Sequence, residues 1–201
     1  MIKLLHCADL HLSGAEGERV YCLSVLDEIV EAALRGNSDY LLFAGDTFNT
    51  FGDAEALRTE FRSRMQSLGS RCHAVLVSGN HEDLGRNRRS LAAFDLGIPP
   101  ESVVEASAGP FSLLRRTGVE FLAVPHRPDH RDYTEWNVPE KTEPFRVAVA
   151  HGIVAGISFT WEERETDACA AVMDPNLFQR NLVDYAAMGH IHSFRRERAG
   201  E

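Results

Sequence analysis

The sequence predicts an α/β fold, because short apolar runs alternate with helical stripes and each early run ends in a polar loop. Ile2 to His6 is the first apolar run and is expected to be a strand. Arg19 to Leu34 carries apolar residues at helical spacing, and Gly36-Asn37 ends that pattern. Tyr40 to Ala44 is a second strand, of the buried type, and it ends at Gly45-Asp46.

Two more elements complete a β-α-β-α-β series. Asp53 to Leu68 is expected to form one helix, with Asp53 as its N-cap and Gly69 as its stop signal. His73 to Val77 is the third strand, and Ser78-Gly79-Asn80 follows it. Since strand-helix-strand crossovers join parallel strands, the first half of the chain predicts a parallel sheet.

The second half of the chain contains shorter strands and longer loops. Thr117-Gly118 marks a turn, and Pro125 to Pro144 is a polar loop that contains proline. The expected strands are Val103-Val104, Phe111 to Arg115, Val119 to Val124, Arg146 to Ala150 and Tyr185 to Met188. No internal repeat or low-complexity segment interrupts the pattern.

Length, charge and cysteine content narrow the class of protein. The 201 residues suffice for one domain with a sizeable core. Acidic residues outnumber Lys and Arg by 30 to 21, and the formal charge of −9 argues against a broad basic face for nucleic acid. The four cysteines form no CxxC pair, so we expect reduced thiols rather than a zinc knuckle or a disulfide framework. No signal peptide or membrane span is recognisable, and a cytoplasmic location is expected.

Polar clusters follow five of the predicted strands. Ligands bind at the carboxyl ends of the strands in open α/β sheets, so these clusters are expected to meet at one edge. Their carboxylates, imidazoles and amide oxygens suit divalent metals such as Mn, Fe or Zn. Each cluster alone is weak evidence for a metal site, since such residues also occur as ordinary surface or core side chains. The order of the clusters along the chain and their placement after strands make the prediction specific. The clusters are Asp9-Leu10-His11, Gly45-Asp46, Gly79-Asn80-His81-Glu82, His151-Gly152 and Gly189-His190-Ile191-His192.

The series D-x-H, G-D, G-N-H-E, H-G and G-H-x-H resembles that of the calcineurin-like metallophosphoesterases, from Asp9 to His192. Leu5 to Leu12 and Ala44 to Phe48 are most similar to the SbcD-type DNA repair exonucleases. The resemblance implies a four-layer αββα sandwich of two mixed β-sheets flanked by helices, with a metal site at the carboxyl ends of the strands. It also implies a metallophosphoesterase domain over residues 1–192 and a charged tail over 193–201.

The same resemblance implies a site for two divalent metal ions, with Mn²⁺ favoured and Fe, Zn or Ni as alternatives. Asp46 would bridge the ions, and His81 would be the catalytic residue, facing the scissile phosphate without binding metal. The other implied ligands are Asp9, His11 and His192 for one ion, and Asn80, His151 and His190 for the other.

Two cations about 3.5–4 Å apart neutralise a phosphodiester and generate hydroxide near neutral pH. The resemblance therefore implies attack by a metal-bridging hydroxide, with His81 assisting the leaving group. A loop histidine that caps the next helix is the competing interpretation of His81. The expected activity is phosphodiester hydrolysis, as in an SbcD-like DNA exonuclease. A small-molecule phosphodiesterase or phosphomonoesterase is the alternative, and a non-catalytic scaffold is the third hypothesis.

Four side chains are candidates for substrate contact. Many family members carry an acid three residues after the bridging aspartate, where this chain has Asn49. An amide stabilises an imidazolium less than a carboxylate does, so we expect a weaker interaction with His81, which an Asn49→Asp change would strengthen. Guanidinium forks match phosphate geometry, although a solvated helix face is the competing explanation for the arginines. The candidates are Asn49, Arg86, Arg88 and Arg89.

The remaining features give weaker indications. His126 and His130 are expected at the surface, and Trp136 and Trp161 are expected to pack rather than to stack on a base. SbcD-type nucleases usually continue past G-H-x-H into further strands and a capping domain, which this sequence lacks. It is therefore either part of a longer protein or a minimal phosphoesterase, and a second copy in a homodimer is one way to complete the sheet. The resemblance implies a phosphodiester substrate, such as DNA, and an SMC-like ATPase partner.

The acidic balance bears on the choice between these substrates. Two divalent cations would bring the formal charge from −9 to about −5 and would leave the pocket itself positive. The charge therefore disfavours a long DNA groove but not phosphate chemistry, and it favours the small-molecule alternative.

Overall fold

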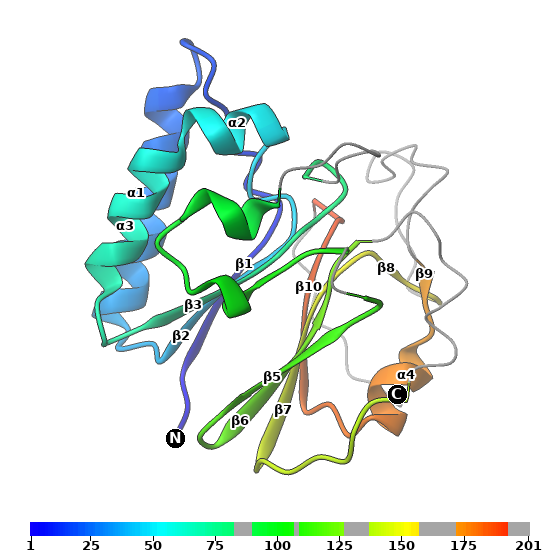
Figure 1. Cartoon of the computed structure of the whole chain (residues 1–201). Helices are drawn as coiled ribbons and strands as arrows, with labels where there is room; N and C mark the ends of the chain where they lie inside the picture. Colours follow the sequence, from blue (N-terminus) through cyan, green and yellow to red (C-terminus); the bar gives the residue numbers. More distant parts are fainter. Residues whose placement is uncertain (83–89, 107–108, 127–136, 157–171, 193–201) are drawn as a thin grey trace.

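The computed structural model describes residues 1–82, 90–106, 109–126, 137–156 and 172–192. Within these ranges, the strands form two four-stranded sheets that pack face to face and one small two-stranded sheet (Figure 1). Helices lie on the outer faces of both large sheets. This arrangement confirms the expected αββα sandwich.

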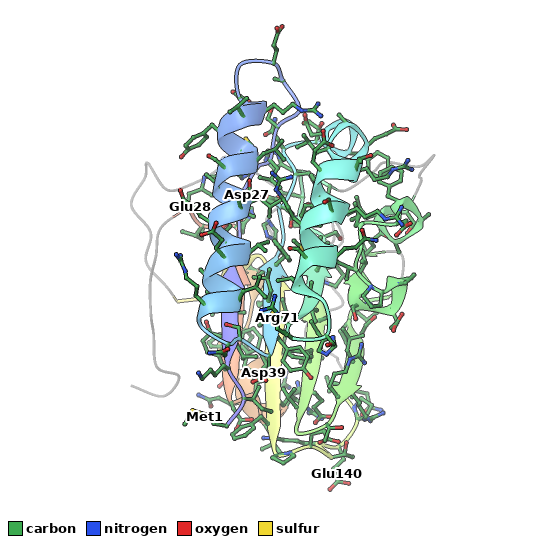
Figure 2. All side chains as sticks on the ribbon, turned by 90° about the vertical axis from the view of Figure 1, so that its left-hand side faces the viewer. Met1, Asp27, Glu28, Asp39, Arg71 and Glu140 are labelled. Carbon is green, nitrogen blue, oxygen red and sulfur yellow. The ribbon has the colours of Figure 1, made fainter. Side chains whose placement is uncertain are left out.

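The first sheet is parallel throughout, in the order β1-β2-β3-β4. Helices α1 (Arg19–Arg35) and α3 (Arg58–Leu68) cover its outer face and lie side by side in Figure 2. Asp27 of α1, labelled there, accepts two hydrogen bonds of 2.8 Å from Arg64 of α3. The strands are β1 (Leu4–Cys7), β2 (Tyr40–Ala44), β3 (His73–Val77) and β4 (Val103–Val104).

The second sheet has the order β10-β7-β6-β5, and its β5–β6 hairpin is antiparallel while the other pairs are parallel. Only this sheet is therefore mixed, whereas the resemblance implied two mixed sheets. Its strands are β5 (Ser112–Arg116), β6 (Val119–Val124), β7 (Phe145–His151) and β10 (Tyr185–Gly189). Helix α4 (Pro175–Arg180) and strand β9 (Val172–Met173), which pairs with β8 (Ile153–Val154), pack on the outer face.

Strand β2 shows why the layers stack in this way. Leu41 and Phe43 pack against the helices, whereas Leu42 and Ala44 face the second sheet. Every residue of β2 is buried because successive side chains point to opposite faces and both faces are covered. A continuous apolar run is what this position requires, and the strand boundaries predicted from that run are confirmed.

The expected single helix from Asp53 to Leu68 is wrong. The structure has two helices, α2 (Phe51–Ala56) and α3, which meet at Leu57. Leu57 is fully buried and has a ψ of 4°, so the chain turns there as its side chain enters the core. The N-cap is Thr50 rather than Asp53: the Thr50 side chain accepts a hydrogen bond from the main-chain N–H of Asp53.

Several short elements were absent from the sequence prediction. Helix α4 has a readable signal, since Asp174 caps it by accepting a hydrogen bond from Asn176 and Pro175 takes the first helical position. Strands β8 and β9 and the 3₁₀ turns η1 (Leu91–Phe94) and η2 (Pro100–Ser102) are too short for periodicity to indicate. In the described part of the chain, no helix has the length and apolar character needed to cross a membrane.

Candidate metal centre

The predicted site residues lie where strands of both sheets end. Asp9 and Asp46 follow β1 and β2, and Asn80 follows β3. His151 is the last residue of β7, and His190 follows β10. The two sheets face each other, so their carboxyl ends bring these residues to one edge of the sandwich, as predicted.

Main-chain hydrogen bonds hold the first two loops in register beyond their strands. The N–H of Asp9 donates to the carbonyl of Gly45 at 3.1 Å, and the N–H of His11 donates to the carbonyl of Asp46 at 3.0 Å. These bonds continue the β1–β2 pairing. The side chains of Asp9, His11 and Asp46 therefore project from one rigid platform rather than from independent loops.

Asp9, His11 and His192 form the first group of potential metal ligands. One ligand atom from each lies within 4.8 Å of the others, and the Nε2 atoms of the two histidines are 3.0 Å apart. The carboxylate oxygens of Asp9 accept hydrogen bonds from the main-chain N–H of His190 at 2.8 and 3.0 Å. Asp9 thus contacts the loop after β10 and ties the first group to the second.

Asp46, His151 and His190 form the second group and are almost completely buried. His151 Nδ1 donates to the carbonyl of Ala44 at 3.0 Å, so Nε2 is the nitrogen that faces the group. That Nε2 lies 3.3 Å from Asp46 Oδ2, 3.3 Å from His190 Nδ1 and 2.9 Å from the amide oxygen of Asn80. Asn80 therefore joins the group, as expected.

The chemistry of this arrangement fits divalent cations. Asp46 Oδ2 is buried and accepts no hydrogen bond from the described residues, although a buried carboxylate oxygen needs a donor or a cation. The surrounding ligand atoms are carboxylate and amide oxygens and imidazole nitrogens, which suit Mn, Fe or Zn. Asp46 belongs to two of the three potential ligand groups in the described residues, the place that a bridging carboxylate would occupy.

The buried charges perturb each other's titration. Burial raises the pKa of Asp9. Burial also opposes ionisation of Asp46, but His151 and the main-chain N–H of His81 outweigh it and lower the pKa of Asp46 to about 2. Burial raises the pKa of Glu82 to about 7, although the N–H groups of Gly79 and Phe48 counteract it. Asp46 is therefore held more firmly as a carboxylate than Asp9 or Glu82 in the metal-free chain.

Two glycines allow the loops to approach closely. A Cβ on Gly79 would lie 2.1 Å from Asp46 Oδ1, and a Cβ on Gly189 would lie 2.0 Å from the carbonyl of Ala44. Side chains at these positions are excluded unless the loops move apart. The glycines in G-N-H-E and G-H-x-H are thus required by packing at the site.

His81 lies at the edge of the first group. Its Nδ1 donates to the main-chain carbonyl of Asn49 at 2.9 Å, and its ring packs edge-to-face on His11 with centroids 4.5 Å apart. The predicted contact through the Asn49 side-chain amide is corrected, since the acceptor is the main chain. His81 also falls within ligand distance of His11 and Asp46, closer to the potential ligands than the sequence suggested.

His126 is a residue near the site that sequence reasoning misplaced. It was expected at the surface, but only 3% of it is exposed and its ring packs edge-to-face on His151, with centroids 6.2 Å apart. Its main-chain N–H donates to the carbonyl of Ser78 at 3.0 Å. The available signal was its place just after β6, since strand-end position identified the other site residues.

Some predicted residues lie outside the described residues. They are the substrate-contact candidates Arg86, Arg88 and Arg89, together with His130, Trp136, Trp161 and the tail over residues 193–201. Among the described residues, Cys7, Cys22 and Cys72 form no disulfide with one another, and Cys169 is not described.

Two groups of carboxylate and imidazole ligands at the strand ends of an αββα sandwich define a metal-dependent phosphoesterase. Residues 2–194 match the family model described as calcineurin-like phosphoesterase. The chain therefore belongs to the calcineurin-like phosphoesterase family, and the resemblance that the motifs indicated is confirmed.

Individual relatives agree with this assignment. The chain is 32% identical over 131 residues to the SbcD component of the SbcCD nuclease from Escherichia coli strain K12, covering 58% of this chain and 30% of that protein. It is 24% identical over 222 aligned positions to the uncharacterized metallophosphoesterase YhaO of Bacillus subtilis strain 168, covering 95% of this chain and 48% of the relative. The chain thus spans less than half the length of either relative.

A solved structure shares the fold. Purple acid phosphatase PPD1 from yellow lupin seeds superposes with a TM-score of 0.60 at 18% identity, covering 95% of this chain and 38% of that chain. At this level of identity, the likeness shows the fold alone.

Proposed function

We propose that this chain is a two-metal phosphodiesterase that hydrolyses DNA in the manner of SbcD-type exonucleases. One observation supports the proposal above all: Asp46, a buried carboxylate with an oxygen that has no hydrogen-bond donor among the described residues, lies within ligand distance of His11 and His81 on one side and of His151 and His190 on the other. Asp46 would bridge two ions, with Asp9, His11 and His192 holding one and Asn80, His151 and His190 holding the other. The ligand chemistry suits Mn²⁺ without distinguishing it from Fe, Zn or Ni.

The bound ions would neutralise phosphate charge and lower the pKa of a water molecule to near neutrality. The chain's own residues would supply the proton for the leaving oxygen. The hydrogen bond from His81 Nδ1 to the Asn49 carbonyl orients the ring, so a proton for the leaving oxygen would come from Nε2. The main-chain N–H of His81 donates to Asp46 Oδ1 at 2.9 Å, which ties this proton donor to the metal centre.

DNA is the proposed substrate because a component of the SbcCD nuclease is among the relatives. By the same family argument, an SMC-like ATPase would be a partner; a homodimer and a cytoplasmic location are further proposals. The formal charge of −9 favours a second candidate, hydrolysis of a small phosphoester. Proposed substrate contacts at Arg86, Arg88 and Arg89 apply to both.

The test is hydrolysis of bis-p-nitrophenyl phosphate with added Mn²⁺ by the wild type, Asp46→Ala and His81→Ala. Loss of turnover in both variants supports the proposal. Retained turnover in the Asp46 variant would refute the two-metal assignment. A panel of single-stranded DNA, duplex ends, cyclic nucleotides and phosphomonoesters then separates the nuclease from the small-molecule enzyme.

A further inference from the structure

Glu82 is a buried carboxylate that the proposed mechanism does not use. It follows His81 in the chain, and 2% of it is exposed. Oε1 accepts a hydrogen bond of 2.9 Å from the main-chain N–H of Phe48, and Oε2 accepts one of 2.9 Å from the N–H of Gly79. One carboxylate therefore binds the main chain of two different loops.

These two loops carry residues of the metal centre. Phe48 lies two residues after Asp46 on the loop that follows β2, and Gly79 directly precedes Asn80 on the loop that follows β3. A third contact, from the N–H of His81 to Asp46 Oδ1, joins the same loops. Glu82 itself belongs to none of the potential ligand groups in the described residues, so its carboxylate connects the loops without supplying a ligand atom.

We propose that Glu82 is a positioning residue that fixes the spacing of Asp46 and Asn80 and thereby sets the affinity of the chain for its two cations. This inference rests on the proposed two-metal function. Buried N–H groups need acceptors, and a carboxylate satisfies two at once with fixed geometry. Residues that hold metal ligands in place typically affect metal affinity or activity 10–100-fold.

Glu82→Gln is the sharpest perturbation, because it keeps the side-chain size but offers one acceptor oxygen instead of two. The amide NH₂ would face either the Phe48 or the Gly79 N–H, and two donors repel each other. The loops would then separate at that contact. Asp46 and Asn80 keep their own side chains in this variant, so any change in metal affinity comes from their placement.

Glu120→Gln is the matched control. Glu120 is also fully buried and accepts a hydrogen bond of 3.0 Å from Arg146, but it lies near the start of β6, at the end of the strand opposite the metal centre. Its substitution loosens the fold without touching either loop. Comparison of the two variants separates a local effect on the site from general destabilisation.

The experiment is calorimetric titration of chelator-stripped full chain with Mn²⁺. We expect Glu82→Gln to bind about 10–100-fold more weakly and Glu120→Gln to bind within about threefold of the wild type. We also expect excess Mn²⁺ to restore phosphodiester turnover in Glu82→Gln. Should that variant not fold, Glu82→Asp replaces it, because its shorter carboxylate reaches only one of the two N–H groups.

Wild-type affinity in the Glu82 variant overturns the inference, and so does equal weakening in both variants. A wild-type chain that binds Mn²⁺ but hydrolyses no phosphoester refutes the proposed function and leaves the binding comparison valid. A wild-type chain that binds no divalent metal refutes both.

Discussion

Gly79→Ala tests whether the metal centre depends on the close approach of two loops. The new Cβ would lie 2.1 Å from Asp46 Oδ1 and 2.4 Å from Asp46 N, whereas ordinary contact begins near 3.4 Å. The φ of Gly79 is not positive, so alanine fits the backbone and the perturbation is steric. Relief requires a displacement of about 1 Å between the loops, and misplacement on this scale lowers catalysis about 10²-fold.

The expected result is a fall in kcat/KM of about 10²-fold, which corresponds to about 2.7 kcal/mol of lost transition-state stabilisation. Overpacking should also lower the free energy of unfolding by about 1–3 kcal/mol. The assay is Mn²⁺-dependent hydrolysis of bis-p-nitrophenyl phosphate, run below the melting temperature of the variant. Gly17→Ala is the control, because a Cβ there meets nothing within 4 Å. If both variants retain kcat/KM within about threefold of the wild type, the steric reasoning is wrong.

Four further predictions concern neighbouring residues and the metal. Asn49→Ala and Asn49→Asp should both leave the pH–rate profile within about threefold of wild type in kcat, because the acceptor for His81 is the main-chain carbonyl. Chelation should lower the melting temperature. Adding Mn²⁺ at a hundred times its Kd should raise the free energy of unfolding, measured in denaturant titrations, by about 2.7 kcal/mol per site. In the metal-free chain, the folded-state pKa of Glu82 is about 7, above its ordinary 4.5. Its contribution to the unfolding free energy is therefore fully present below pH 4.5 and is lost as the pH rises through 7. Glu82→Gln should flatten the plot of unfolding free energy against pH between these values. His126→Ala should weaken Mn²⁺ binding measured by calorimetry, whereas His126→Phe, which retains a ring against His151, should bind as the wild type does.

The sequence predicted most accurately the strands that are covered on both faces. Strands β2, β3 and β6 have the boundaries expected from their apolar runs, because packing on both faces favours apolar residues at most positions. The break at Leu57 was not predictable in the same way. A buried leucine fits a continuous helix and a turn between two helices equally well, and only the tertiary contacts decide.

The same distinction applies to the site. Residue type and strand-end position predicted the polar clusters, and the resemblance to the metallophosphoesterases assigned the individual ligands within them. The acceptor for His81 was not found, since a main-chain carbonyl is present at every residue and leaves no trace in the sequence. Thr50 and Asp174, as helix caps, show the intermediate case, in which the residue type is informative but several neighbours qualify.

The backbone of the site shows that these side chains are held at the expense of local strain. Asp9, His11 and Asp46 have φ values of 53°, 44° and 47°, and His190 has a φ of 106°. Left-handed conformations cost roughly 1–2 kcal/mol for residues with a Cβ, less for aspartate, and glycine would avoid the penalty. Glycine supplies no ligand, however. At these four positions, backbone stability therefore favours glycine, whereas metal binding would require the carboxylate or imidazole. In the described part of the chain, four of the seven non-glycine residues with positive φ thus lie beyond the carboxyl ends of strands at the site, where bound cations would offset part of the cost.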